Sequence, residues 1–564
     1  MYTGAFDSPG PGPWELEQTH FTRPMTRWMQ AVFPGAQMRG MREAFSRYGA
    51  LVDTVETLPV QGFAYGRIRP LGAPPDSKGH PPRLVMKALF VLHPEMRRRV
   101  HRCADAFERK LWREDMARWD GEWRPEAERQ NAALAAVEPS ALDDDALRAH
   151  LRDARTRLEH AMYRHHSLNV TCGLPVGDFI AHAAAWTGKP LSSLLGLLTG
   201  SSPVSVGAAE EMTRLVCALR AAPDAAALFA SDDDAAATLE RLRTWTGEVG
   251  AAARAYLDKV GLRLLSGYDV GDYYALEVPI VLVRAIRASL ENAALPQTNR
   301  AAERLAEIRD AVPADRRADF DALLEEARFV NRLRDERGYL NDAPASGIAR
   351  RALLEAGRRL ADRGRLHATD HALDLSPEEV DALLAGLAGP SADDIAAASH
   401  WRATKTHADA PARLGPEPAA PPPVEWLPPA SARAMRAINA LFAAMFDVRE
   451  NKARPQAGAI VSGFAASPGR IDGIARLVVR PEHFQKVQQG DILVAAMTCP
   501  SYNVLLPILG AIVTDRGGLL SHAAIVAREY GLPAVVGTRD ATRMIPDGAR
   551  VRVDGGAGTV EILG

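Results

Sequence analysis

The chain contains very little cysteine. Only four of its 564 residues are cysteines. They are Cys103, Cys172, Cys217 and Cys499. None lies in a C-x-x-C motif or at zinc-ligand spacing from a histidine, which excludes a disulfide scaffold and a zinc module. The adjacent pair His165 and His166 is interpreted as a helix surface, because neighbouring residues on a helix do not face each other. We therefore predict no metal site, and buried thiols in a reducing cytoplasm.

Long hydrophobic runs and a charge of one sign are also missing. The most apolar helical stretch, 274–286, is too short and too interrupted to cross a bilayer. Acidic residues at 7, 15 and 17 occur where a secretory signal would need a basic start and an apolar run. The 68 basic and 70 acidic residues provide no positive field for nucleic acid or an anionic membrane. We expect a cytoplasmic protein with no nucleic-acid partner and no membrane partner.

The composition, with 47% hydrophobic and 24% charged residues, is typical of a globular protein and excludes intrinsic disorder. From about 97 to 402 the chain is rich in Ala, Leu, Arg and Glu, with apolar residues recurring at helical spacing. A proline-rich segment, 408–429, interrupts the helices, and a last amphipathic helix is predicted over 431–446 with Ser431 as N-cap. We assign 1–446 to one mostly helical domain, including the first 90 residues, and 447–459 to a linker.

The pattern changes after residue 460, where short apolar runs alternate with turn residues. The segments predicted as strands are Ile474–Val479, Asp491–Ala496, Ala511–Thr514, Ala534–Val536, Arg550–Val553 and Thr559–Ile562. The fold class is therefore multidomain, α followed by α/β, with a small β/β/α domain over 460–564.

One segment of the small domain carries the clearest chemistry. A strand leads into a two-glycine turn, Ser521 stands where a helix N-cap would be, and His522 opens a strong helix-forming run. Free backbone N–H groups and the positive end of the helix dipole favour a neutral imidazole on this exposed turn and would stabilise a phosphoryl group attached to it. A neutral imidazole is a competent nucleophile. The residues predicted to support a phosphoryl group there are Gly517, Gly518, Ser521, Arg516 and Arg528.

A histidine at a helix start is more often a simple capping or surface residue, but this segment also resembles a known signature. Residues 517–525 read Gly-Gly-Leu-Leu-Ser-His-Ala-Ala-Ile, and 527–537 continue Ala-Arg-Glu-Tyr-Gly-Leu-Pro-Ala-Val-Val-Gly, after Ala-Ser-Pro-Gly at 466–469. This is similar to the swivelling phosphohistidine domain of phosphoenolpyruvate-utilising enzymes, the family of pyruvate phosphate dikinase, phosphoenolpyruvate synthase and rifampicin phosphotransferase. The resemblance implies that His522 is phosphorylated at one site and carried by rotation of the domain to a second site.

The sequence departs from that family in three ways. Leu520 stands where dikinases carry a threonine, so the regulatory phosphorylation known in some relatives is not expected. The pyruvate-binding barrel that follows the histidine domain in relatives is not seen, so Cys499 is not given the acid role of a barrel cysteine. No Gly-rich phosphate loop followed by lysine is found in the first 460 residues. We therefore expect ATP and Mg²⁺ to be bound by a separate ATP-grasp-type subunit, an organisation that resembles phenylphosphate synthase.

The large domain resembles the helical acceptor domain of rifampicin phosphotransferase. The likeness is carried by Trp14-x5-His20-Phe21-x-Arg23-Pro24 and by Arg-Asp-Glu-Arg-Gly-Tyr at 334–339. It implies that this domain holds a small molecule with a hydroxyl group. The polar candidates for that pocket are His20, Arg23, Arg263, Asp269, Glu277 and Arg337. Each of them taken alone is more often a solvated or salt-bridged residue.

Two functions from different classes follow. In the first, the chain is a phosphotransferase component that carries a phosphoryl group on His522 from an ATP-grasp partner to a small organic hydroxyl, with His20 or Asp269 as a possible base. The phosphate ester would be either the product or a leaving group for elimination. In the second, the chain is a non-catalytic relative that binds a ligand or partner and uses the swivelling domain as a regulatory module. The intact turn around His522 favours the first.

Overall fold

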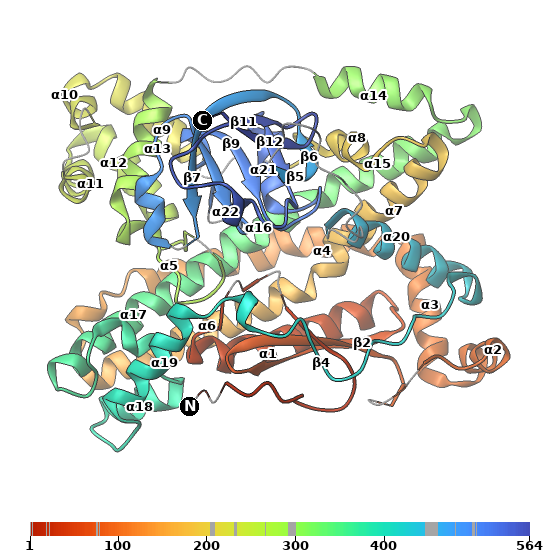
Figure 1. The fold of residues 1–564 in the computed structure, drawn as a ribbon, viewed down its shortest axis with the longest axis horizontal. Helices are drawn as coiled ribbons and strands as arrows, with labels where there is room; N and C mark the ends of the chain where they lie inside the picture. Colours follow the sequence, from red (N-terminus) through yellow and green to blue (C-terminus); the bar gives the residue numbers. More distant parts are fainter. Residues whose placement is uncertain are drawn as a thin grey trace. The chain divides into compact units, whose positions relative to one another are not determined.

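The protein is described from a computed structural model of the 564-residue chain (Figure 1). The description covers all positions except 1, 3, 18, 19, 22, 75, 76, 78, 203–208, 230–233, 266, 292–299, 446–460, 480, 499–501, 504 and 564. The predicted linker 447–459 and Cys499 lie outside the described residues. The chain forms two compact units. Unit 1 comprises Met1–Cys172, Gly267–Asp272 and Leu340–Arg436, and unit 2 comprises Gly173–Ser266, Tyr273–Tyr339 and Ala437–Gly564.

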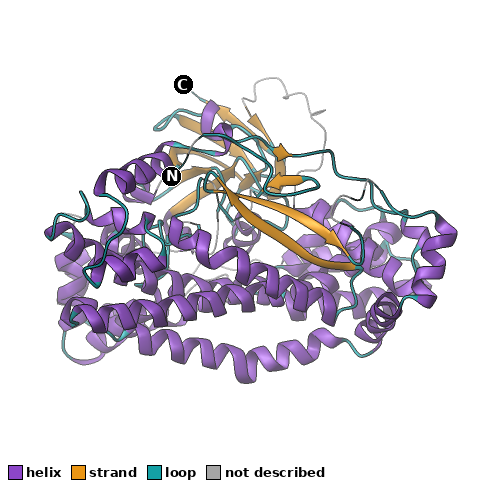
Figure 2. Cartoon of the chain, turned by 90° about the horizontal axis from the view of Figure 1, so that it is seen from below, coloured by secondary structure: helices purple, strands orange, loops and turns teal. Residues whose placement is uncertain are grey.

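Helices predominate in the chain (Figure 2), and unit 1 is mostly helical, as its sequence predicts. Its helices are α1 (Arg27–Arg47), α2 (Arg83–Leu92), α3 (Pro94–Glu108), α4 (Leu111–Arg118), α5 (Arg124–Ala135), α6 (Asp144–Ser167), α17 (Ala343–Asp362), α18 (Pro377–Leu384) and α19 (Ala392–Thr404). Helix α6 shows why they form: the Asp143 side chain accepts a hydrogen bond from the Ala146 amide at 2.8 Å, and Leu147, Leu151 and Leu158 are buried on one stripe.

A small antiparallel sheet in unit 1 was not predicted. It has the order β2-β3-β1-β4, formed by Val52–Val60, Phe63–Pro70, Trp14–Leu16 and Arg413–Leu414. Strands β2 and β3 are joined by Gln61 and Gly62, which both have positive φ, the geometry of a tight two-residue hairpin. The sequence signal for this hairpin is weak, because glutamine rarely adopts the positive φ that Gln61 has in the turn. The pairing is stabilised by a buried cluster that contains Trp14, Phe63 and Leu414.

Two further expectations need correction. Helix α20 begins at Pro429 and ends at Met445, so Ser431 lies inside the helix and is not its N-cap. Proline is well suited to the first helical turn because its missing N–H would have no partner there. Of the thiols, Cys103 and Cys172 are buried as predicted, whereas Cys217 is exposed.

Unit 2 contains a second group of helices and the C-terminal sheet (Figure 1). The helices are α7 (Asn169–Thr187), α8 (Leu191–Leu195), α9 (Ala209–Arg220), α10 (Pro223–Ala226), α11 (Ala235–Thr244), α12 (Gly247–Val260), α13 (Pro279–Glu291), α14 (Arg300–Asp310), α15 (Arg317–Asn331), α16 (Leu333–Glu336), α21 (His522–Tyr530) and α22 (Ala541–Met544). The start of α7, residues 169–172, belongs to unit 1. Helix α15 buries Phe320, Leu324 and Val330 at helical spacing, as predicted.

The C-terminal sheet contains all six predicted strands. They are β7 (Arg470–Val478), β8 (Asp491–Ala495), β9 (Leu509–Thr514), β10 (Ala534–Val536), β11 (Arg550–Asp554) and β12 (Thr559–Ile562), with β5 (Val461–Ser462) and β6 (Phe464–Ser467) in addition. The order is β5-β12-β11-β7-β8-β9-β10-β6, and β7 to β10 run parallel in the centre. Strands β5 and β6 lie at opposite ends of this order but are joined by Gly463 alone, so the sheet curls until its two ends meet.

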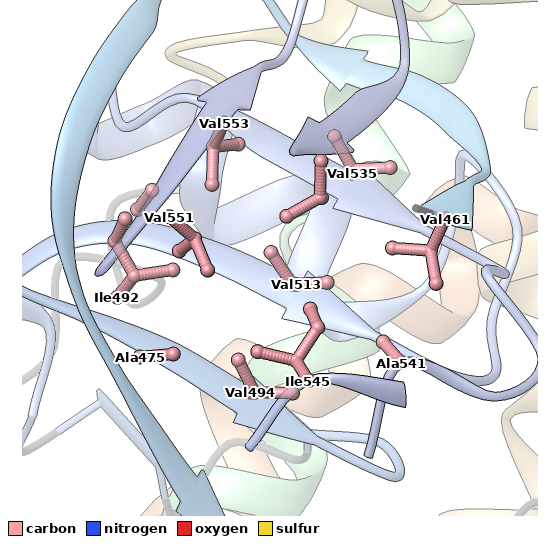
Figure 3. Close-up of a cluster of buried hydrophobic side chains, with 12 residues drawn as sticks. Val461, Ala475, Ile492, Val494, Val513, Val535, Ala541, Ile545, Val551 and Val553 are labelled. Atoms are coloured by element: carbon pink, nitrogen blue, oxygen red, sulfur yellow. The ribbon is translucent and has the colours of Figure 1, made fainter. Parts of the chain in front are cut away.

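Valine and isoleucine side chains fill the curled sheet (Figure 3). The cluster contains Val494 from β8, Val513 from β9, Val551 from β11 and Ile545 from the segment after α22, each at most 1% exposed. Burying one such side chain stabilises the fold by about 1.5–3 kcal/mol. The architecture of a large helical region followed by a small C-terminal α/β domain is confirmed, and the exact domain boundaries stay predictions. No helix in the described ranges is both long and apolar enough to span a membrane.

Candidate functional site

The turn between β9 and α21 has the predicted geometry. Ser521 has the extended φ and ψ of an N-cap, −65° and 158°, and its Oγ accepts from the Ala524 amide at 3.5 Å. Gly517 has φ of +102°, and a Cβ at that position would lie 2.7 Å from Cβ of Ser521. Glycine is therefore required there both by backbone conformation and by space. His522 is the first residue of α21.

The His522 ring is partly buried and held at both nitrogens, rather than lying on an exposed turn. Its Nδ1 lies 3.0 Å from Oγ1 of Thr498, and its Nε2 lies 2.9 Å from Oδ1 of Asn503. Thr498 and Asn503 are both buried. The contacts fit a neutral imidazole in which Nε2–H donates to Asn503 and Nδ1 accepts from the Thr498 hydroxyl.

The electrostatic surroundings keep this imidazole neutral. Burial lowers the pKa of His522 to about 4, while the charge of Asp335 raises this pKa and that of Arg334 lowers it. Asp335 is 4% exposed and accepts from the Ser202 hydroxyl at 3.4 Å, and Arg334 donates to the Leu520 carbonyl at 2.9 Å. At neutral pH the ring thus keeps the lone pair that a nucleophile needs.

The predicted supporting residues Arg528, Gly518 and Arg516 each donate a hydrogen bond to a backbone carbonyl near the turn. Arg528 donates to the carbonyls of Ala466 at 3.2 Å and Leu519 at 2.9 Å, and burial lowers its pKa to about 10. The Gly518 amide donates to the Met445 carbonyl at 2.8 Å, at the end of α20. A Cβ on Gly518 would lie 2.4 Å from the Ala444 carbonyl oxygen, so this glycine permits the close approach of the end of α20. The Arg516 amide donates to the Ala496 carbonyl at 2.9 Å.

Three predicted substrate-binding residues belong to unit 1. Asp269 accepts from the amide and hydroxyl of Thr26 at 2.8 and 2.7 Å, at the start of α1. Arg23 pairs with Asp272 at 2.8 Å. His20 Nδ1 lies 3.1 Å from Oε1 of Glu17. Asp269 and Arg23 are therefore part of the framework that holds the loop 267–272 against the start of α1.

The other three belong to unit 2. Arg263 is buried, with its guanidinium carbon 3.4 Å from the centre of the Tyr339 ring, and burial lowers its pKa. Glu277 accepts from the Tyr274 amide at 3.0 Å and closes a short helical turn. Arg337 is also buried and opens the π-helical turn Arg337–Asp342.

His165 and His166 do not form a helix surface, contrary to expectation. Both are buried, and His165 Nδ1 contacts Oδ2 of Asp342. They lie in the last turn of α6, where other parts of unit 1 cover both faces of the helix. Throughout the described residues, no group of three or more His, Cys, Asp or Glu side chains is placed to hold a metal ion.

Thr498 and Asn503 were not predicted from the sequence. They follow β8, and His522 follows β9, the neighbouring parallel strand. The carboxyl ends of parallel strands meet at one edge of a sheet, which is where ligands bind in such sheets. The polar residues that follow β8 could therefore have been predicted from the sequence to lie near His522. Arg334 and Asp335 come from a distant part of the chain, and only the folded unit brings them to the ring.

Two families match this chain. Residues 487–558 match the family described as the mobile domain of PEP-utilising enzymes, and residues 176–335 match the rifampicin phosphotransferase fourth domain. These two segments of the chain are thus similar to the mobile domain of phosphoenolpyruvate-utilising enzymes and to a helical domain of rifampicin phosphotransferase. Both matched segments belong mainly to unit 2.

Individual relatives agree with this assignment. An uncharacterised Mycobacterium tuberculosis protein is 30% identical over 369 residues, which is 64% of this chain and 37% of that protein. The rifampicin phosphotransferase of Bacillus subtilis is 48% identical over 107 residues, covering 19% of this chain and 12% of the enzyme. The phosphoenolpyruvate synthase of Aeropyrum pernix is 46% identical over 112 residues, covering 20% and 14%. The chain therefore spans well under half the length of these relatives.

The low pKa of His522 gives a testable pH dependence. Phosphorylation by phosphoramidate, a small-molecule phosphoryl donor, is compared with that of N-acetylhistidine under the same conditions. Free imidazole loses its lone pair to a proton below about pH 6.5, whereas His522 stays neutral down to about pH 4. The ratio of the two rates, protein over N-acetylhistidine, is expected to rise as pH falls from 7 to 5. A ratio independent of pH would show that His522 titrates like a free histidine.

Proposed function

We propose that this chain is a phosphotransferase component that carries a phosphoryl group on His522. The donor is ATP on an ATP-grasp-type subunit, and the acceptor is the hydroxyl group of a small organic molecule. The observation that best supports this proposal is the neutral imidazole at the first position of α21, within a segment matching the mobile domain of PEP-utilising enzymes. ATP as donor also agrees with a cytoplasmic location.

The first step forms a bond between phosphorus and an imidazole nitrogen. Nε2 is the better candidate because it lies at the tip of the side chain, whereas Nδ1 lies beside the backbone. The nucleotide leaves with the electron pair of its P–O bond as the N–P bond forms. Nε2 has a lone pair for this attack only after the ring changes tautomer, so that the proton leaves Nε2 and a proton binds Nδ1. The Thr498 hydroxyl, 3.0 Å away, can then accept a hydrogen bond from Nδ1–H instead of donating one.

The surroundings can stabilise the phosphorylated ring. The start of α21 offers backbone N–H groups and the positive end of the helix dipole, which stabilise an anion by about 0.3–2 kcal/mol. Asn503 must release Nε2 when phosphorus binds there. Its buried amide nitrogen has no hydrogen-bond acceptor in the present state and could donate to a phosphoryl oxygen. Mg²⁺ bound with the nucleotide would neutralise charge on the transferring group.

In the second step the acceptor oxygen attacks phosphorus and the N–P bond breaks. The electron pair of that bond returns to Nε2, and His522 becomes neutral again. The hydroxyl proton must pass to a base as the O–P bond forms. The resulting phosphate ester is the product or the substrate of a following elimination.

The separate donor leads to a direct expectation. Chain incubated alone with γ- or β-labelled ATP is expected to stay unlabelled, because we find no nucleotide-cradling loop in its first 460 residues. Phosphoramidate, which needs no nucleotide site, should still phosphorylate it. Scintillation counting of the acid-labile phosphate on the protein measures both reactions. Strong labelling by ATP without a second subunit would contradict the separate donor.

The alternative, a non-catalytic protein that uses this domain as a regulatory module, predicts a different result. A docking module has no need of a reactive nitrogen, so the phosphoramidate-treated chain would transfer nothing to any alcohol. The neutral, partnered ring of His522 and its fit to the turn support the catalytic hypothesis.

A further inference from the structure

The end of α20 is bound to the turn 517–520 that precedes His522, and both segments belong to unit 2. The Gly518 amide donates to the Met445 carbonyl at 2.8 Å, and the Leu520 amide donates to the Ala444 carbonyl at 2.9 Å. The last carbonyls of a helix have no partner inside that helix, so the turn supplies the donors that the end of α20 needs. We call Ala444 and Met445 the strap.

The turn is shaped to receive the strap. A Cβ on Gly518 would lie 2.4 Å from the Ala444 carbonyl oxygen and 2.9 Å from the Met445 carbonyl carbon. The backbone of Gly518, unlike that of Gly517, does not have the positive φ that favours glycine. Glycine is therefore needed at 518 to leave room, and the strap fills that room. Ala444 and Leu520 are each 1% exposed, so their contact excludes water.

Arg334, from α16, fastens the strap to the turn. Its Nη2 donates to the Leu520 carbonyl at 2.9 Å, and its Nη1 lies 3.8 Å from Sδ of Met445. The charge of the same guanidinium also acts on the His522 ring. A movement of the strap therefore changes the immediate surroundings of the nucleophile.

The strap occupies groups that an incoming phosphate would use. Backbone amides of a glycine turn that leads into a helix form a favourable site for phosphate oxygens. Here the amides of Gly518 and Leu520 are taken by carbonyl oxygens. These carbonyls also form the negative end of the α20 dipole, which is equivalent to about half an elementary charge. A phosphate group and the strap therefore cannot bind these amides at the same time.

We infer that the strap is an autoinhibitory contact, which closes the turn before His522 until the phosphate chain of a nucleotide donor displaces it. This inference rests on the proposed function and adds a control step before the first transfer. While the strap is bound, the His522 ring keeps its contacts with Thr498 and Asn503 and is shielded from the donor. When the strap leaves, the amides of Gly518 and Leu520 become donors for phosphate oxygens. Only hydrogen bonds change in this step.

Weakening the strap should make the full chain easier to phosphorylate. Ala444→Gln places a longer side chain at a position that is 1% exposed, and should move the strap off the turn. Phosphoramidate needs no nucleotide site, so it reports on access to the ring alone. Its rate of reaction with His522 is expected to rise about tenfold, the shift that the loss of two hydrogen bonds produces in such an equilibrium. Acid-labile phosphate on the protein measures this rate.

Hydrogen exchange followed by mass spectrometry measures the strap itself. The amides of Gly518 and Leu520 are expected to exchange slowly in the wild type and faster in Ala444→Gln. Ala443→Gln makes the same change at the neighbouring, partly exposed position and should match the wild type in exchange and in phosphorylation. Unchanged exchange in β9 shows that the variants are folded.

A second variant reaches the same contact from the side of the turn. Gly518→Ala adds a Cβ that would lie 2.4 Å from the Ala444 carbonyl oxygen, so the strap must move. Both the exchange of the Leu520 amide and the rate with phosphoramidate should rise. Gly556→Ala adds a Cβ in the same domain whose nearest neighbour, Oδ1 of Asp554, lies 3.4 Å away, and it should change neither quantity.

The possible results separate the strap from the proposed function. Faster exchange together with faster phosphorylation in Ala444→Gln and Gly518→Ala supports autoinhibition. Faster exchange without faster phosphorylation would overturn it, because the strap would then not limit access to His522. Unchanged exchange in both variants would overturn the contact itself. A wild-type chain with protected amides that phosphoramidate never phosphorylates on His522 would instead refute the proposed function.

Discussion

Replacement of His522 by alanine is expected to abolish phosphorylation of the chain and all transfer to an alcohol. A reaction that proceeds through a bond to the imidazole has no route once the imidazole is gone, so the expected loss is complete within detection. The fold should survive, because the ring is only partly buried and its partners, Thr498 and Asn503, are neutral. Incorporated acid-labile phosphate, measured after treatment with phosphoramidate, checks the result.

A second histidine in the same domain provides the control. His483 lies in the short helical segment after β7, where its Nδ1 is 3.1 Å from the Leu477 carbonyl oxygen. His483→Gln should be phosphorylated as fast as the wild type. Substantial phosphoryl transfer by His522→Ala would show that His522 is not the phosphoryl carrier, whatever the result for His483→Gln.

Replacement of Asp269 by alanine is expected to destabilise unit 1 rather than to remove a substrate contact. The Asp269 carboxylate is 6% exposed and accepts from the Thr26 amide, the Thr26 hydroxyl and the Gly271 amide, at 2.8, 2.7 and 2.8 Å. Leaving such buried donors unpaired costs about 1–3 kcal/mol each. The free energy of unfolding should therefore fall by roughly 3 kcal/mol or more. Phosphorylation of His522, which belongs to unit 2, should be unaffected.

Denaturant unfolding followed by tryptophan fluorescence measures this change, since unit 1 contains Trp14 and Trp28 in its core. Asp370→Ala removes an exposed carboxylate of the same unit and should leave the transition in place. If the unfolding transition of Asp269→Ala is unchanged and phosphoryl transfer to an alcohol is weaker, Asp269 binds the acceptor rather than stabilising the fold.

The C-terminal domain was predictable because its local signals agree with one another. Short apolar runs with turn residues between them located all six predicted strands to within a few residues, and Ser521 capped α21 as its position suggested. The short strands β5 and β6 were missed because each is too brief to show a period, and their pairing depends on partners distant in the sequence.

The N-terminal region was harder for a physical reason. Strand β4 has two residues and lies within the proline-rich segment, where nothing in the local sequence indicates pairing with β1 about 400 positions earlier. His165 likewise contacts Asp342, which folding brings from a remote part of the chain. Local periodicity describes single elements, and it contains no information about which elements cover them.

The same limit applies to the candidate site. The nucleophile and its turn are contiguous in the sequence, so residue order alone identified His522, Ser521 and Gly517. The groups that set its charge state are not contiguous. Thr498, Asn503 and Arg334 reach the ring only through strand order and helix packing. The pKa of the ring is low because folding buries it and, to a lesser degree, because Arg334 is positively charged.

The central claim is that His522 is the phosphoryl carrier, and site mapping tests it most directly. The wild-type chain is phosphorylated with phosphoramidate, digested at alkaline pH and sequenced by mass spectrometry under conditions that preserve phosphohistidine. The expected result is one dominant phosphate, stable to base and labile to acid, on His522. Phosphate distributed over exposed histidines such as His160 and His367, with none on His522, would contradict the account.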